Sequence, residues 1–365
     1  MQDCFSISKC TKDLEILGNP RLKKWLRHKN FVIFGIGGSS LGGQCIHEIT
    51  RSNNVRFAES LDPTTLQKMF SDINPDETGF LCISKSGETL ETICQILLAL
   101  DFIKEKEDKF VFITENKLSP LRKIANELNS LCIDHPKTIG GRFSVFSIVG
   151  MLPALICGVD PTKIRSGGKQ ILENHLEKIE EGSFFMIENF QKKRSQHVAF
   201  IYTDKLIKFG AWLAQLYAES TGKNGLGITP LTAIGTQDQH SQLQLYLDGN
   251  EDKYFTFFFE NQESKSCIAQ NKYLLPELSY LENKTTGSIF KAQYTATMTS
   301  LLEKKCSVRK IEVPEISPEV MGALFMHFML EVVCVCKFME VDPFSQPAVE
   351  YGKILAKKML SESLC

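Results

Sequence analysis

The sequence predicts an α/β protein with two doubly wound domains, whose parallel sheets are flanked by helices, plus a C-terminal helix. Short apolar runs bounded by Gly, Ser or Pro alternate with longer helical patterns, which is typical of parallel α/β units. The length of 365 residues and a hydrophobic content of 43% allow more than one large core. We expect the domains to span residues 28–160 and 185–340, and the C-terminal helix to lie within 341–365.

Five apolar runs in the first half of the chain predict the first sheet. Each run is short and rich in Val, Ile and Phe, as expected for strands that are buried on both faces. Helical patterns such as ETLETICQILLALDFIKEKED and SPLRKIANELN lie between them. The five runs are FVIFGIGG, NVRFAES, GFLCISKS, DKFVFITE and NSLCIDH.

Four further runs predict the second sheet. A helical block, GGRFSVFSIVGMLPALICGVD, joins the two series and is punctuated by Gly and Pro. The second series begins after a charged stretch around residues 176–194. Its four runs are HVAFIYTD, GITPLTAIG, KYFTFFFE and CSVRKIEVP.

Charge and cysteine usage limit the kind of partner and the compartment. Lys plus Arg number 42 and Asp plus Glu number 43, so the balance argues against nucleic acid or an anionic membrane as the main partner. The 12 cysteines include no CxxC pair, which favours reduced thiols over a disulfide framework or structural zinc. The N-terminus lacks the apolar core of a signal peptide, and His327 and Glu331 interrupt the longest apolar stretch. We therefore expect a soluble cytoplasmic protein.

A glycine-rich turn, GIGGSSLGG, follows the first predicted strand and opens a helix. Backbone amides at a helix N-terminus favour an anion, and glycine allows a ligand to approach closely. The GxGxxG spacing of a dinucleotide site fails, because the spacing that begins at Gly35 places Ser40 at its last position. However, Glu59 lies near the place of a ribose-binding acid. A dinucleotide site therefore remains open at this point.

A second polar turn, SKSGETLET, follows the third predicted strand. Ser84, Ser86 and Thr89 offer three hydroxyls where another helix begins, although such residues are also ordinary helix caps. Both turns lie at carboxyl ends of strands, which meet at the ligand-binding edge of an α/β sheet. Because no GK[ST] motif is present, the pair of turns favours a monoester phosphate on a small metabolite over a nucleoside triphosphate.

Glu219 lies at the predicted end of an apolar helix in the stretch WLAQLYAES, where the helix end carries partial negative charge. This position disfavours a carboxylate, so Glu219 is either a tolerated surface acid or a base that moves protons. Gln215 lies one turn earlier on the same helical face, and Gly222 is expected to end the helix. Arg142, in GGRFS, follows two glycines and could stabilise developing negative charge.

Two further candidate catalytic residues, His240 and Lys353, also have ordinary structural explanations when each is considered alone. His240 lies in a polar loop, GTQDQHSQLQ, where a histidine often serves only as a hydrogen-bonding group. Lys353 lies on the predicted helix QPAVEYGKILAKKML, with Gln346 about two turns earlier, and Lys357 could make it part of a solvated basic face.

Together these stretches resemble the phosphoglucose isomerase family. The similarity runs from GIGGSSLGG to VEYGK in the family's order, and the set GGRFS, QxxxES-x-GK, QHS and VE-x-GK is highly specific. The resemblance implies two sugar-isomerase-type domains and an enzyme that interconverts glucose 6-phosphate and fructose 6-phosphate through an enediolate. It also implies no metal and no cofactor, and a homodimer in which the loop histidine enters the neighbouring subunit's active site. The segment before the first strand, about thirty residues, is shorter than is typical of the family.

The resemblance assigns catalytic roles residue by residue. Glu219 matches the base that shuttles a proton between sugar carbons 1 and 2, and Arg142 matches the arginine that stabilises the enediolate. His240 and Lys353 match the pair that opens the sugar ring. A non-catalytic sugar-phosphate sensor with the same fold would need none of Glu219, His240 and Lys353, so their presence disfavours that alternative.

The remaining matches are to substrate contacts. They cover the family's phosphate loops and its further contacts to the sugar. In dual phosphoglucose/phosphomannose isomerases the position of Gln346 is usually Thr, so Gln346 favours glucose specificity. The matching residues are Ser39, Ser84, Lys85, Ser86, Thr89, Gln215 and Gln346.

Overall fold

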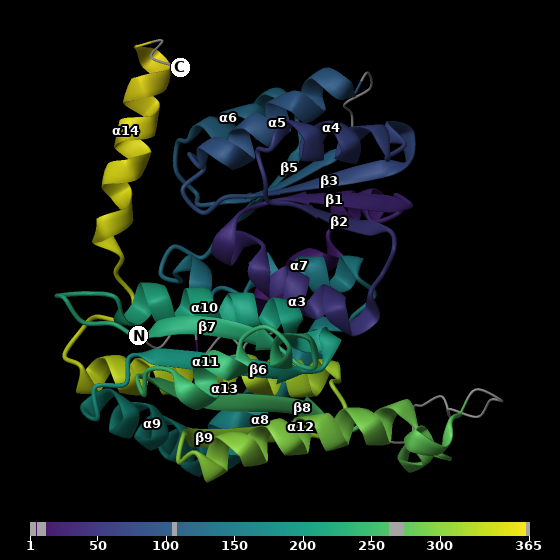
Figure 1. The fold of residues 1–365 in the computed structure, drawn as a ribbon. Coiled ribbons are helices and arrows are strands. Elements are labelled where there is room, and N and C mark those ends of the chain that lie inside the picture. The colour runs from purple at the N-terminus through teal and green to yellow at the C-terminus, as the bar shows by residue number, and fades with distance from the viewer. Residues whose placement is uncertain (1–4, 6–11, 104–107, 263–273, 363–365) are drawn as a thin grey trace.

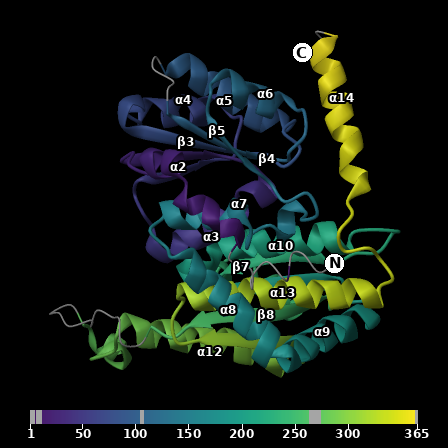
Figure 2. The same cartoon turned by 180° about the vertical axis from the view of Figure 1, so that it is seen from behind.

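The computed structural model describes residue 5 and residues 12–103, 108–262 and 274–362. Within these residues the chain forms two parallel β-sheets that lie one above the other, with helices between them and on their outer faces (Figure 1). The last helix stands beside the layer that contains the first sheet (Figures 1 and 2). The predicted fold class is confirmed.

The first sheet contains the five predicted strands, in the order β2-β1-β3-β4-β5 and all parallel. Successive residues of β1 point to opposite faces, so Ile33 and Phe34 belong to two different cores. Helices α4, α5 and α6 cover one face, and α2, α3 and α7 cover the other. The strands are β1 (Asn30–Phe34), β2 (Val55–Ala58), β3 (Thr78–Ile83), β4 (Phe110–Thr114) and β5 (Leu131–Asp134), and the helices are α2 (Pro20–Trp25), α3 (Leu41–Thr50), α4 (Pro63–Ser71), α5 (Leu90–Phe102), α6 (Pro120–Glu127) and α7 (Ile148–Ile156).

The second sheet contains the other four predicted strands, in the order β7-β6-β8-β9, again all parallel. Helices α11 and α12 pack on one face, and α10 and α13 pack on the other. The strands are β6 (Gln196–Tyr202), β7 (Thr229–Ile234), β8 (Lys253–Glu260) and β9 (Ser307–Val313), and the helices are α8 (Pro161–Asn174), α9 (Leu176–Gln191), α10 (Ile207–Thr221), α11 (Leu243–Asp248), α12 (Thr286–Glu303) and α13 (Pro318–Phe338).

One continuous hydrophobic core joins the two halves of the chain. It contains residues of α3 and α7 from the first half and residues of α10 and α13 from the second half, and Figure 1 shows α3 and α7 next to α10 between the sheets. Because α10 lies at this junction, its polar end can meet loops that follow strands of the first sheet.

Helix α13 is the one helix of the described residues that is long and apolar enough to cross a membrane, but 61% of its most apolar stretch is buried inside the fold. The two polar residues that interrupt this apolar helix, His327 and Glu331, make contacts inside the fold. Glu331 is fully buried, pairs with Arg309 of β9 at 2.6 Å, and lies 3.2 Å from the ring of His327. Burial raises the pKa of Glu331, but Arg309 and His327 outweigh burial, so that its pKa lies well below the ordinary value. The hydroxyl of Tyr217 on α10 also donates to Glu331, which ties α10 to α13.

The C-terminal helix α14 (Glu350–Ser361) has no buried residue and stands away from the sheets (Figures 1 and 2). A short 3₁₀ helix, η8, precedes it. The other 3₁₀ helices are η1 (Lys12–Gly18), η2 (Gly37–Ser39), η3 (Pro75–Glu77), η4 (Gly141–Phe143), η5 (Asp204–Leu206), η6 (Gln237–Gln239) and η7 (Pro276–Leu281), and η8 spans Pro347–Val349.

Candidate active site

The glycine turn after β1 lies against residues from distant parts of the chain. Gly37 has a φ of +58°, and a Cβ there would lie 2.9 Å from Nε2 of Gln215 on α10. A Cβ on Gly38 would lie 2.2 Å from the carbonyl carbon of Gly141, which begins η4. Only glycine allows this approach, and it brings the turn, η4 and α10 together. Ser39 follows in the same turn and is half-buried.

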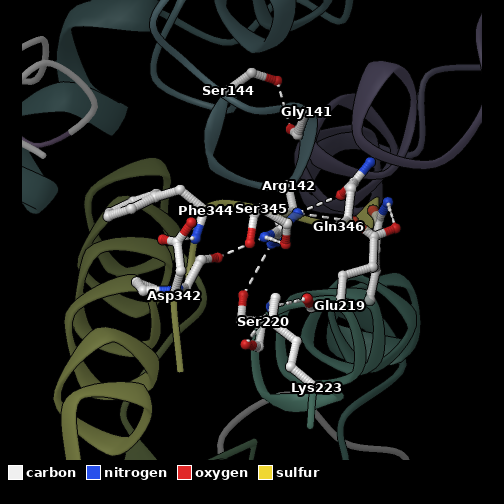
Figure 3. A network of polar contacts seen from close by, with 12 residues as sticks. Gly141, Arg142, Ser144, Glu219, Ser220, Lys223, Asp342, Phe344, Ser345 and Gln346 are labelled. Atoms are coloured by element: carbon white, nitrogen blue, oxygen red, sulfur yellow. Dashed lines mark hydrogen bonds and ion pairs between the residues drawn. The ribbon is translucent and has the colours of Figure 1, made fainter. Parts of the chain in front are cut away.

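Arg142 is the centre of a polar network and is only 2% exposed (Figure 3). Its Nε donates to Oγ of Ser220 at 2.8 Å, and its Nη1 donates to Oε2 of Glu219 at 3.0 Å. The other contacts go to the segment between α13 and η8: Nη1 donates to Oε1 of Gln346, and Nη2 donates to the carbonyls of Pro343 and Ser345. A guanidinium has five N–H groups, so these five contacts use its whole donor capacity.

The charge of Arg142 is held in this network against the cost of desolvation. Burial lowers the pKa of Arg142, and the carboxylate of Glu219 acts in the opposite direction. Arg142 is therefore a fixed cation beside the carboxylate of Glu219, the base that the sequence predicts.

Glu219 lies in the last turn of α10, and both of its carboxylate oxygens have partners. Oε1 accepts from Nε2 of Gln215 at 2.9 Å, and Oε2 accepts from Arg142. The helix ends at Gly222, as the sequence predicted. The amide of Gly222 makes the last helical hydrogen bond, to the carbonyl of Ala218 at 3.0 Å, and its ψ of 75° then turns the chain out of the helix. The Glu219 side chain keeps 28% exposure, so a ligand can reach it.

The SKSGET turn after β3 is an internally bonded loop. The hydroxyls of Ser84 and Thr89 lie 2.8 Å apart, and Oγ of Ser84 accepts from the amide of Gly87 at 3.1 Å. Ser84 is buried, whereas Ser86 is exposed. Thr89 occupies the N-cap position of α5, yet its hydroxyl makes no capping bond, so the cap alternative does not account for Thr89. Lys85 is 3.6 Å from Glu115.

The two turns flank the topological switch point of the first sheet. β1 pairs with β2 on one side and β3 on the other, so the turns after β1 and β3 begin at adjacent carboxyl ends. Doubly wound sheets bind ligands in the crevice at this point. The residues assigned to phosphate binding therefore lie at the edge where a ligand is expected.

Lys353 lies on α14, exposed and 2.7 Å from Oε1 of Glu350. A cleft of about 460 Å³ separates this part of α14 from the start of α5, and Ser86 and Thr89 line it together with Lys353. The interpretation that Gln346 belongs to the same helix is wrong. Gln346 has extended φ and lies before η8, outside α14, where its side chain reaches Arg142.

His240 does not join the other candidates within one chain. It is exposed at the end of η6, which follows the carboxyl end of β7. α10 runs back from the end of β6 to the start of β7, where Oγ1 of Thr221 accepts from the amide of Ile228 at 3.0 Å. Glu219 and His240 are thus at opposite ends of β7, whose six residues span about 20 Å at ~3.3 Å per residue.

The network contains residues to which the sequence assigned no role. Ser220 and Lys223 both lie in the motif QxxxES-x-GK, so the motif could have identified them as site residues, although the sequence analysis gave them no role. The carbonyls of Pro343 and Ser345 had no signal, because a main-chain acceptor carries no side-chain identity.

Solved structures define the class of this fold. A crystal structure of a hypothetical protein from Thermus thermophilus matches with a TM-score of 0.88 at 28% identity, covering 98% of this chain and 89% of that one. A glucose-6-phosphate isomerase from Chlamydia trachomatis matches with a TM-score of 0.79 at 20% identity, covering 96% of this chain and 72% of that one. A tagatose-6-phosphate ketose/aldose isomerase from Escherichia coli matches with a TM-score of 0.63 at 14% identity, covering 94% and 93%. The fold is that of the sugar-phosphate isomerases.

Sequence comparison then gives the family. The sequence model of the phosphoglucose isomerase family matches residues 23–364. The glucose-6-phosphate isomerase of Thermus thermophilus is 31% identical over 348 residues, covering 91% of this chain and 84% of the relative. That of Campylobacter jejuni is 32% identical over 354 residues, covering 91% and 86%. The chain belongs to the phosphoglucose isomerase family, and the resemblance stated from the sequence is confirmed.

Proposed function

We propose that this protein interconverts glucose 6-phosphate and fructose 6-phosphate in glycolysis and gluconeogenesis, in the cytoplasm. The observation that carries the proposal is the contact between Arg142 and Glu219, 3.0 Å apart, beside the turns of the first sheet's switch point. A base and a fixed cation at the edge that suits a phosphate are what an aldose–ketose isomerase requires.

The chemistry assigns Glu219 the proton transfer. Moving the carbonyl from C1 to C2 requires that a proton leaves C2 and returns to C1. One carboxylate lying over both carbons can do both steps. The partly exposed Glu219 carboxylate, oriented by Gln215, suits this role. Oε1 of Gln215 is buried and has no hydrogen-bond partner among the described residues, so it can accept a bond from a substrate hydroxyl.

We assign to Arg142 the stabilisation of the negative charge that develops on the substrate. The enediolate carries negative charge, which a preorganised guanidinium stabilises strongly in a desolvated site. Because all five of its donors are occupied, Arg142 must exchange one existing bond for a substrate oxygen. The Nη1 bonds to Glu219 and Gln346 are the suitable ones, since the other contacts hold Arg142 to buried Ser220 and to main-chain carbonyls.

Ring opening needs a second acid–base function near O5 and O1, and we assign it to Lys353 and His240. Lys353 shares a cleft with the SKSGET turn of its own chain. His240 is at the far end of β7 from Glu219, so we propose that it acts in the site of a second subunit of a homodimer.

A coupled assay tests the proposed activity. With fructose 6-phosphate as substrate, we expect glucose 6-phosphate to form with no nucleotide or metal beyond what the coupling enzyme itself uses. Gln346 leads us to expect much less activity on mannose 6-phosphate. A folded protein that binds fructose 6-phosphate but forms no product would instead be the sugar-phosphate sensor considered above.

The phosphate turns give a separate prediction. Replacing Ser84, Ser86 and Thr89 together by Ala should weaken the binding of phosphorylated ligands by at least tenfold, with a much smaller relative effect on stability. Ser86 alone is the sharpest variant, because it is exposed and its loss breaks only one loop contact, with the amide of Glu88. Binding is measured by titration with 6-phosphogluconate and stability by thermal melting.

The matched control for this prediction is Thr285→Ala, which removes a true helix cap in the second half of the chain. The hydroxyl of Thr285 accepts from the amide of Ser288 at 3.0 Å, and losing such a cap costs about 1 kcal/mol. We expect this variant to melt earlier yet bind ligand normally. If the serine variants behave in the same way, the turns are only structural.

A further inference from the structure

The C-terminal end of α10 is a poor place for an anion. The last carbonyls of a helix have no intrahelical partner and carry partial negative charge. Glu219 lies in this last turn, so the negative helix end opposes its ionised form. A general base must be ionised before it can accept a proton, so a nearby positive charge that opposes the helix end keeps a larger fraction of the carboxylate ready to react as the pH falls.

Lys223 supplies a positive charge at this helix end. Its Nζ donates to the carbonyl of Glu219 at 2.7 Å and to the carbonyl of Ser220 at 2.6 Å (Figure 3). The chain is already turned out of the helix by Gly222, and the amide of Lys223 bonds to the carbonyls of Thr221 and Leu226. The ammonium is therefore not required to end the helix, although it bonds to two carbonyls of the last turn, of which that of Ser220 also accepts from the thiol of Cys336 at 3.2 Å.

The surroundings of Glu219 contain four groups whose charge matters. Arg142 approaches from η4, Lys223 from the end of α10, Cys336 from α13, and Asp342 from the segment after α13. Cys336 is neutral near pH 7, because burial raises its pKa to about 12. Burial and then Arg142 lower the pKa of Lys223, so a second cation is held beside Arg142 against electrostatic repulsion.

We propose that Lys223 is a positioning residue for the base: its ammonium offsets the negative end of α10 and keeps Glu219 ionised when substrate draws Arg142 away. This inference rests on the proposed function. Arg142 has no spare donor, so a substrate oxygen that takes an Nη1 bond weakens the ion pair of Glu219 just before proton transfer. Lys223 contacts only main-chain carbonyls, so its support remains during this exchange.

The pH dependence of kcat/KM tests the proposal. In Lys223→Met the loss of a cation destabilises the carboxylate, so Glu219 stays protonated to higher pH. We expect the acid limb to move up by about 0.5–1 pH unit, with activity lost mainly at low pH and largely recovered at high pH. Lys223→Arg should restore the parental profile. Lys68→Met is the matched control, because Lys68 also lies in the last turn of a helix, far from the site, and should leave the limb unchanged.

A second measurement does not depend on activity. The Glu219 carboxyl can be titrated by carbon-13 NMR of protein labelled at glutamate, with the signal assigned by its absence in Glu219→Gln. We expect its midpoint to rise in Lys223→Met and to stay at the parental value in Lys223→Arg. An unchanged midpoint, or a loss of kcat/KM that is uniform across pH with a lower melting temperature, overturns the proposal and leaves Lys223 a helix cap. Absence of isomerase activity in the parental protein would instead reject the proposed function, and the titration would still decide the role of Lys223.

Discussion

Replacing Glu219 by Gln should lower kcat by about 10²–10⁴-fold, the contribution of a positioned general base. Gln keeps the size of the side chain but cannot accept the proton from the substrate carbon. The site itself should survive. The new amide oxygen can accept from Arg142, while Gln215 turns its own amide to accept from the new NH₂ group. The variant is assayed with fructose 6-phosphate under saturating conditions.

Binding and a control variant show whether the loss is chemical. A five-carbon sugar-acid phosphate that mimics the enediolate should bind this variant with far less loss than kcat shows. Glu303→Gln is the matched control, because Glu303 is also a glutamate in the last turn of a helix, exposed and outside the network. It should retain full turnover. Near-normal kcat in Glu219→Gln would remove Glu219 from the mechanism.

The elements were predictable from sequence because their local patterns were unambiguous. All nine strands of the described residues fall on the predicted runs. The central strands β1, β3, β4, β6 and β8 are buried almost throughout, as their apolar sequences predicted, whereas β9 is an edge strand that carries charged residues and has no buried position. The end of α10 was equally predictable, because Gly222 directly follows Thr221, the last residue of the apolar helical pattern. The pairing of Gln215 with Glu219 then follows from helical geometry alone.

The long-range contacts of the site residues were harder to predict from the sequence. Gln346 was placed on the C-terminal helix, but it immediately precedes Pro347, and a residue before proline is driven out of the α-helical region. The chain therefore stays extended there and turns Gln346 towards Arg142. The main-chain partners of Arg142, more than 200 positions away, leave no trace in side-chain identity. The same applies to any contact that needs a second subunit.

Mixing two inactive variants should restore activity if His240 serves the neighbouring site. Glu219→Gln and His240→Ala should each be nearly inactive alone. In a mixed dimer, one site receives both lesions and the other receives neither. Random pairing makes half of the dimers mixed, and each has one intact site, so about a quarter of parental activity should return. The variants are co-expressed with different tags, and the mixture is assayed after heterodimers have been demonstrated.

A second mixture gives the matched control, because the structure places Lys353 and Glu219 differently from His240. Lys353 shares a cleft with Ser86 and Thr89 of its own chain, so it should serve the same site as that chain's Glu219. A mixture of Glu219→Gln with Lys353→Ala then leaves one lesion in every site, and no activity should return. Recovery with His240→Ala but not with Lys353→Ala requires that the ends of β7 serve two different sites, as their separation within one chain suggests. If neither mixture recovers although heterodimers form, each site is built from a single chain, and η6 must move towards Glu219 when substrate binds.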